Sequence, residues 1–273
     1  MAFTGSAGQP ENKEIGRSHV RYSVIRNILA LMLREMSTRY GRTPGGYIWG
    51  VVEPLAAIMF LAIGFSLLLR TPSLGTSFIL FYATGYVVFN LYQVISKSTS
   101  MAINFSKALL RFPAVNWFDA IVARFVLNSL TGIMTSIILL TIILNIVENR
   151  TVLELGPIVE AFALAMLLGL GVGVLNCTLI GLFPVWDMIW GIITRPLFLA
   201  SGIIYIYEDL PKLAQDILWY NPLVHITGLT RTGFYTTYSP TYIDTVYVFY
   251  VSITLLFFGL LLTRRYSREI LNR

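Results

Sequence analysis

The stretch TRYGRTPGGYIWGVVEP, residues 38–54, lies between a polar N-terminal segment and the first long apolar run of the chain. Pro44, Gly45 and Gly46 predict the end of one helix and a sharp bend, because proline cannot continue a helix and glycine adopts positive φ. Trp49 belongs to a residue type that gathers at the membrane–water interface. The stretch is therefore expected to form an elbow where the chain enters a membrane.

Composition supports a membrane protein. Of the 273 residues, 56% are hydrophobic and only 12% are charged, with a mean hydropathy of +0.70, whereas a soluble domain carries about 25% charged residues. Crossing the hydrocarbon core takes about 20 residues in a helix. Six apolar runs have this length, at about 48–69, 76–96, 124–147, 160–184, 188–207 and 245–263. We therefore expect an all-α membrane protein with six spans.

The basic residues predict the orientation of the spans, because Lys and Arg favour the cytoplasmic side. Fifteen of the 20 lie before the first run, between the second and third runs, or after the sixth. Both termini are then cytoplasmic, and the net charge of +6 reflects topology and not nucleic-acid binding. Residues 1–20 are polar without an apolar signal-peptide core, which indicates a disordered cytoplasmic tail before a single transmembrane domain at 21–273.

Residues 22–40 carry apolar side chains at every third or fourth position, with arginines on the opposite face. This pattern predicts an amphipathic helix lying on the cytoplasmic leaflet, and a soluble helix packed on another subunit is the alternative. Glu53 and Pro54 follow about one turn inside the first span, where a carboxylate is costly unless it is paired or faces water. The amphipathic helix, the elbow and the first span are therefore expected to act either as a lever that transmits motion or as a membrane anchor.

The second span is rich in aromatic residues, with Tyr82, Tyr86 and Phe89 on one face and Tyr92 one turn further. Such residues usually pack against neighbouring helices, but tyrosine hydroxyls at mid-depth need hydrogen-bond partners. A conduit with a polar lining is therefore the second interpretation. Between the second and third spans, Ser98–Phe112 predicts a short cytoplasmic helix that docks on a partner, with a solvated hairpin as the alternative.

The external segment 208–245 is too long for a simple connection. Its apolar spacing predicts two short helices, Leu210–Trp219 and Pro222–Tyr235, that dip back toward the outer leaflet as a gate or as a passive lid. The GLGVG stretch at 169–173 lies inside an uncharged run and lacks the spacing of a nucleotide-binding loop, so it predicts close packing of helices.

The chain offers little for catalysis. It has two histidines, His19 and His225, and one cysteine, Cys177, without metal-ligand spacing. The phosphate-binding pattern G-x-x-x-x-G-K-[ST] does not occur in the sequence, so ATP hydrolysis would need another chain. We expect a protein that is not an enzyme and binds no cofactor.

Three motifs then resemble the permease subunit of polysaccharide-exporting ABC transporters, in the capsular branch of the type-2 export superfamily. The first is LREMSTRYGRTPGGYIWGVVEP (33–54), the second is KALLRFPAVNWFDA (107–120), and the third runs from RPLFLASGIIY (195–205) to WYNPLVHITGLTRTGFY (219–235). They cover nearly the whole chain in order. Gly228 departs from the pattern, which often has an acid there, and this leaves the partner of Arg231 open.

The resemblance implies a half-channel that forms a homodimer and binds two copies of a cytoplasmic ATPase subunit, which holds ATP and Mg²⁺. The cargo would be a capsule or lipopolysaccharide-type glycan crossing the bacterial inner membrane, and a lipid anchor and periplasmic export proteins are left open. An exporter of a small molecule or lipid is the first alternative, and an ATP-independent channel or scaffold is the second. An aromatic lining suits a sugar polymer, because sugar C–H faces stack on rings while hydroxyls bond to phenols.

The resemblance also assigns roles by position. The substrate channel would use Tyr82, Tyr86, Phe89 and Tyr92. The interface elbow would use Arg39, Tyr40, Gly45, Gly46, Trp49, Glu53 and Pro54. The contact with the ATPase would use Lys107, Leu110, Arg111, Phe112 and Pro113. The external gate would use Arg195, Pro196, Trp219, Asn221, Pro222, His225 and Arg231.

Overall fold

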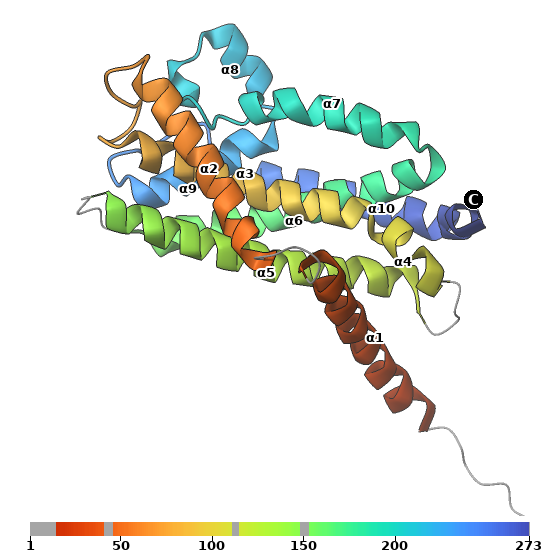
Figure 1. Ribbon diagram of the computed structural model, residues 1–273. Helices are drawn as coiled ribbons and strands as arrows, with labels where there is room; N and C mark the ends of the chain where they lie inside the picture. Colours follow the sequence, from red (N-terminus) through yellow and green to blue (C-terminus); the bar gives the residue numbers. More distant parts are fainter. Residues whose placement is uncertain (1–14, 41–45, 111–114, 148–152, 273) are drawn as a thin grey trace, which may run out of the picture.

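The computed structural model describes residues 15–40, 46–110, 115–147 and 153–272, and within these ranges every regular element is a helix (Figure 1). The predicted all-α class is thereby confirmed. The helices are α1 (Ile15–Tyr40), α2 (Gly46–Ser66), α3 (Phe78–Ser100), α4 (Ala102–Leu110), α5 (Trp117–Ile146), α6 (Leu155–Leu182), α7 (Val185–Ala200), α8 (Lys212–Leu218), α9 (Pro222–Phe234) and α10 (Thr245–Asn272), with a 3₁₀ turn η1 (Tyr207–Asp209).

Five of these helical segments are long and apolar enough to cross a membrane: Ile48–Ser66, Phe78–Leu110, Trp117–Ile146, Leu155–Leu182 and Thr245–Asn272. They correspond to five of the six predicted spans. The run 188–207 forms the shorter helix α7 of 16 residues, which is about 24 Å long. The prediction that this helix reaches residue 207 is wrong, because Gly202 takes a positive φ of 71° and ends it.

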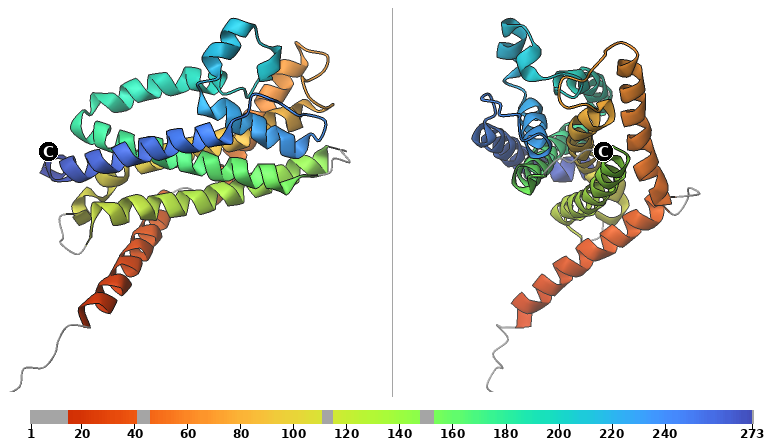
Figure 2. Two further views of the ribbon diagram at one scale, coloured as in Figure 1. Left: turned by 180° about the vertical axis from the view of Figure 1, so that it is seen from behind. Right: turned by 90° about the vertical axis from the view of Figure 1, so that its left-hand side faces the viewer.

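The N-terminal helix α1 begins at Ile15, so residues 15–20 are helical and do not belong to the predicted tail. Apolar periodicity marks the part of a helix that packs and not the point where its hydrogen-bond ladder starts. α1 approaches the bundle at a steep angle from its N-terminal end and packs against α5 (Figures 1 and 2). Gly46, with φ of 26°, lies within the predicted elbow, of which residues 41–45 lie outside the described residues.

The second span and the short helix that follows it are nearly continuous, because α3 runs to Ser100 and α4 starts at Ala102. The hydroxyls of Ser98 and Ser100 donate to the carbonyls of Ile95 and Lys97, so polar residues beyond the apolar run stay within the helix. The predicted short helix Ser98–Phe112 is thus confirmed as α4 with a later start. Its predicted last residues, 111 and 112, lie outside the described residues.

At the centre of the bundle, α6 packs against α3 and α10. A methyl group at Gly169 would lie 2.9 Å from the carbonyl oxygen of Tyr92 on α3. One at Gly171 would lie 2.6 Å from the carbonyl oxygen of Ser252 on α10. The backbones approach closely only because these side chains are absent, which confirms the packing role predicted for residues 169–173.

The predicted pair of short helices after the fifth apolar run is present as α8 and α9. α9 is largely buried against α3, α6 and α10 at one end of the bundle, whereas α8 has no buried residue and projects from it (Figure 1). The connection of α2 to α3, the last turn of α5 and the first turn of α6 lie at the same end, and α4 lies at the opposite end (Figure 1).

Candidate functional site

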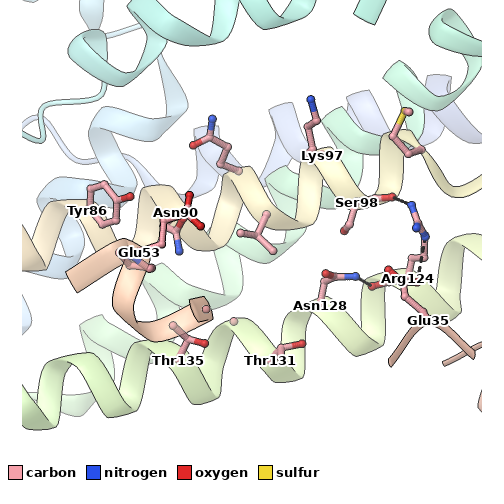
Figure 3. A pocket seen from close by; sticks show the side chains of 16 residues that line it. Glu35, Glu53, Tyr86, Asn90, Lys97, Ser98, Arg124, Asn128, Thr131 and Thr135 are labelled. Carbon is pink, nitrogen blue, oxygen red and sulfur yellow. Dashed lines mark hydrogen bonds and ion pairs between the residues drawn. The ribbon is translucent and has the colours of Figure 1, made fainter. Parts of the chain in front are cut away.

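A cleft of about 580 Å³ lies between α1, α2, α3 and α5, and we call it the α3–α5 cleft (Figure 3). Two stripes of polar residues line it, each with successive spacings of four, three and four residues, which places each stripe on one face of its helix. The α3 stripe is Tyr86, Asn90, Gln93 and Lys97, and the α5 stripe is Arg124, Asn128, Thr131 and Thr135. A polar groove therefore runs along two helices that are otherwise apolar enough to span a membrane.

Glu53 lines the same cleft from the second turn of α2, near Tyr86 and Asn90 (Figure 3). Pro54, the proline inside α2, also lines it. The carboxylate is exposed to the cleft and not embedded among apolar side chains. The cost of an acid at membrane depth is reduced where it faces water or polar groups, which explains how this first span accommodates a charge.

An ion pair closes the end of the cleft near α4. The Nε of Arg124 on α5 donates to Oε2 of Glu35 on α1 at 3.0 Å, and both side chains are nearly buried. Arg124 Nη1 donates to the carbonyl oxygen of Ser98 at 2.7 Å, and its guanidinium carbon lies 4.3 Å from the ring centre of Phe105 on α4. One arginine thus joins α1, α3, α4 and α5 (Figure 3).

The four aromatic residues predicted for the channel do not share one surface. Tyr82 is buried, with its ring centre 5.3 Å from that of Phe65 on α2, and it packs these two helices together. Tyr86 lines the α3–α5 cleft. Phe89 and Tyr92 line a separate cleft of about 490 Å³ between α3 and α7, the α3–α7 cleft. Arg195 also lies in this second cleft, and Pro196 follows it as an exposed residue of α7.

Other predicted gate residues do meet, at the start of α9. Asn221 caps the helix by accepting the N–H of Leu223 at 3.1 Å, and Pro222 is the first helical residue. The amide of Asn221 also donates to the carbonyl oxygen of Ala200 at 2.9 Å. This one side chain therefore starts α9 and ties it to the last residue of α7.

His225 is buried one turn into α9. Its Nε2 donates to the carbonyl oxygen of Trp219 at 2.7 Å, and its Nδ1 accepts the backbone N–H of Asp244 at 3.1 Å. Burial lowers the pKa of His225 below its ordinary value. The ring is therefore neutral and joins the α8–α9 turn to the start of α10, which is a positioning role and not that of a base.

Arg231 is 2% exposed. Its Nη1 and Nη2 donate to the carbonyl oxygens of Tyr205 and Ile203, each at 2.8 Å, and its guanidinium lies 4.2 Å from the ring centre of Phe81. Burial lowers the pKa of this guanidinium. Arg231 thus holds the irregular segment after α7 against α9 and α3 through backbone carbonyls.

The surroundings of Gly228 explain why this chain lacks the acid that the family pattern often has at this position. A side chain at this position would collide with the hydroxyl of Tyr242. The phenol occupies the space next to Arg231 that a longer residue would need, and the backbone carbonyls take over the pairing of the guanidinium. The departure at Gly228 is consistent with the rest of the structure.

The remaining predicted positions are less informative. Trp49 is 59% exposed on α2, as expected for a residue at the membrane interface. On α4, Lys107 is half-buried and Leu110 packs into the bundle with Ile121. Arg39 and Tyr40 end α1, and their side chains lie outside the described part of the chain, as do Gly45, Arg111, Phe112 and Pro113.

Several residues that line the α3–α5 cleft were not predicted from the sequence, because only the aromatic residues of the second span were considered and not its amides. The signal was available, because Asn90, Gln93 and Lys97 follow Tyr86 at helical spacing within an apolar run. The Glu35–Arg124 pair had no such signal, since 89 residues separate its members. Among the residues that the structure describes, no group of three or more His, Cys, Asp or Glu is placed to hold a metal ion.

Comparisons with known proteins agree with this architecture. Residues 26–235 match the family model described as ABC-2 type transporter. The polysialic acid transport protein KpsM of Escherichia coli is 28% identical over 243 residues, which are 89% of this chain and 94% of the relative. The capsule polysaccharide export inner-membrane protein CtrC of Neisseria meningitidis serogroup B and the like-named BexB of Haemophilus influenzae are each 26% identical over 245 residues, covering 90% of this chain and 92% of the relative.

Proposed function

The chain belongs to the ABC-2 type transporter family, and we propose that it is the membrane-spanning half-channel of an ATP-driven exporter that moves a polysaccharide across the bacterial inner membrane. The polar stripes of α3 and α5 carry this proposal. They form a groove inside a bundle whose helices are apolar enough to span a membrane. Relatives named for polysialic acid transport and capsule polysaccharide export align over most of this chain, which supports a glycan as the cargo.

The membrane arrangement is part of the proposal. α7 would act as the fifth of six spans, reaching across with the residues that follow it and with local thinning of the bilayer, since its own length falls short of the ~30 Å hydrocarbon core. α8 and α9 would be the external re-entrant helices. The cytoplasmic side would hold both termini and α4, in agreement with the distribution of Lys and Arg.

Energy would come from a separate ATPase subunit, present in two copies, that holds ATP and Mg²⁺ and docks on α4. The Arg124 junction supports this step, because it connects α4 to α1 and thereby to the elbow before α2. A second copy of the chain would complete the channel. α2 and α7 expose large apolar side chains such as Phe60 and Ile192, which suits them to face another subunit or lipid.

Deletion of the gene in its own host tests the proposal. Surface glycan should disappear while polymer accumulates in the cytoplasm, and the wild-type chain should restore export. A chain that pairs with the ATPase should also be recovered together with it from the membrane. An unchanged glycan surface, accompanied by a new sensitivity to a drug or a lipid defect, would refute polysaccharide export and favour a small-molecule exporter.

A further inference from the structure

The α3–α7 cleft has a lining of mixed chemistry. Its volume of about 490 Å³ falls within the range typical of ligand pockets. Its lining comprises the aromatic residues Phe89, Tyr92, Trp190 and Phe198, the polar residues Gln93, Ser96, Asp187 and Thr194, and the cations Lys97 and Arg195. Aromatic faces next to fixed charges are unusual on a surface that needs only to pack against lipid.

The cleft exists because α7 is fixed at its ends and packs poorly between them. Near its start, Nε1 of Trp186 donates to Oδ1 of Asn176 on α6 at 2.8 Å. Near its end, the ring centre of Phe198 lies 5.3 Å from that of Phe89 on α3. No residue of α7 is fully buried. The two attachments therefore hold α7 across a gap that the side chains of this chain do not fill.

Lys97 and Arg195 are both exposed in this cleft. Within the described part of the chain, neither side chain has a hydrogen-bond or ion-pair partner, and Figure 3 shows that Lys97 points away from α5. An unpaired cation in a membrane-spanning bundle is costly unless it faces water or an anionic ligand. These two charges mark the cleft as a wet, electropositive surface.

Asp187 is the acid that lines the same cleft. It lies in the first turn of α7, where the helix dipole stabilises a carboxylate. It forms no ion pair with Lys97 or Arg195 in the described structure. The cleft thus presents two cations against one carboxylate, and an anionic group that enters would find net attraction.

The aromatic residues determine what kind of anion fits. Trp190 is stacked against Trp186 with ring centres 6.4 Å apart and planes at 24°, so its indole is held in a defined orientation. Rings of this kind offer flat apolar faces on which the C–H face of a sugar ring can lie, while Gln93 and Thr194 supply hydrogen bonds for its hydroxyls.

We propose that the α3–α7 cleft is a subsite for the anionic groups of the transported polysaccharide, with Lys97 and Arg195 binding a sugar carboxylate or a phosphate and Trp190 stacking on the sugar. The inference rests on the proposed export function and adds that the polymer is acidic. The planar guanidinium of Arg195 suits two-point binding of either oxyanion, and the ammonium of Lys97 acts as a point charge.

Binding to the purified full-length chain in detergent tests the subsite, with tryptophan fluorescence as the readout. The probes are an oligogalacturonate, which carries carboxylates, a glycerol phosphate oligomer, and a neutral malto-oligosaccharide of the same length. At least one acidic probe should change the fluorescence at concentrations where the neutral probe does not. The Trp190→Phe variant should lose most of that change, because its indole lies in the cleft.

Variants that remove the positive charges distinguish a loss of binding from a loss of folding. Lys97→Gln/Arg195→Gln should weaken binding of the acidic probe by about tenfold or more, since hydrogen bonds to charged groups are the strong ones. Lys97→Arg/Arg195→Lys should keep most of the affinity, and Arg70→Gln, which removes an exposed cation outside the cleft, should leave binding unchanged. Equal binding of acidic and neutral probes, or full affinity in the double Gln variant with an unchanged elution profile, would overturn the inference.

Export in the host distinguishes this inference from the function on which it rests. The double Gln variant should reach the membrane at wild-type levels yet leave acidic polymer inside the cell. If gene deletion removes surface polymer but the double Gln variant exports normally, or if that polymer is neutral, the subsite is wrong and the export function stands. If deletion leaves the surface polymer intact, the export function itself fails.

Discussion

The Glu35–Arg124 pair should be the most sensitive polar contact of the bundle. Its side chains are 5% and 10% exposed, so neither charge is well solvated in the folded chain. Removing one member of a buried pair costs about 3–5 kcal/mol, because the other charge is left without compensation. In Glu35→Ala, Arg124 keeps its bond to the Ser98 carbonyl and its contact with Phe105, so we expect a loss near the lower limit, about 3 kcal/mol.

For a chain of this size, about 3 kcal/mol corresponds to a fall in melting temperature of roughly 6–12 °C. The assay is thermal denaturation of the detergent-solubilised chain at one scan rate, because an irreversible transition shifts with scan rate. Arg124→Ala should cost at least as much, since it leaves the Glu35 carboxylate buried alone. Glu160→Ala, which removes an exposed acid of α6, should change the melting temperature little.

The double variant Glu35→Ala/Arg124→Ala decides whether the two side chains act together. If they do, its loss of stability should be smaller than the sum of the single losses by about 2 kcal/mol, within the range seen for residues in direct contact. Additive losses, or single losses no greater than that of Glu160→Ala, would show that the pair does not hold α1 to α5. A contact other than this ion pair would then have to connect α4 to the elbow before α2.

Four further predictions follow from the same contacts. Gly173→Ala should lower the melting temperature by an amount equal to roughly 1–3 kcal/mol, because its Cβ would lie 2.9 Å from a carbonyl oxygen of α3, whereas Gly64→Ala has open space and should be tolerated. Tyr86→Ala should impair export with little loss of stability, and Tyr82→Ala should do the reverse, as cell-surface glycan and melting curves would show. Because burial lowers the pKa of His225, the imidazole is protonated in the unfolded chain at a higher pH than in the folded chain. The contribution of this residue to stability is therefore present above about pH 6.5 and is lost as the pH falls below that value. The melting temperature of His225→Gln should accordingly depend less on acid pH than that of the wild type. Hydrogen exchange measured by mass spectrometry should be faster in α2 and α7 than in α3 and α6, and equal protection of all four would contradict the packing described above.

Much of the architecture follows from sequence, because hydropathy and helical periodicity are local properties. Five of the six spans predicted from the apolar runs are present as helices long enough to cross a membrane, and the spacing of polar and apolar residues predicts α1, α4, α8 and α9. The end of α7 was missed, since Gly202 looks like any glycine within an apolar run. The segment that follows Gly202 is held by a distant residue, Arg231, which donates to the carbonyl oxygens of Ile203 and Tyr205.

The candidate site was predicted only in outline. The aromatic face of the second span was identified, but its members are divided between a buried contact and two clefts, according to which helix packs beside each turn of α3. Arg195 was assigned to the external gate by the family resemblance, and in the structure it lines the α3–α7 cleft, which was not predicted. Such assignments depend on contacts between distant segments, which neither composition nor spacing encodes.

Both clefts share one wall, and this arrangement has a mechanical consequence. Gln93 and Lys97 of α3 line the α3–α5 cleft and the α3–α7 cleft alike. The α3–α4 segment is the most buried of the candidate spans, at 67% of its most apolar window, while α2 has only 17% buried. α3 packs against α6, so it is the fixed wall.

The opposite walls of the two clefts are α2 and α7. α2 is attached through the α1 junction with Arg124, and α7 is attached through the contact of Asn221 on α9. We therefore expect motion at the α4 end of the bundle to widen the first cleft through α2, and motion at the α9 end to widen the second cleft through α7, while α3 stays in place as the wall common to both.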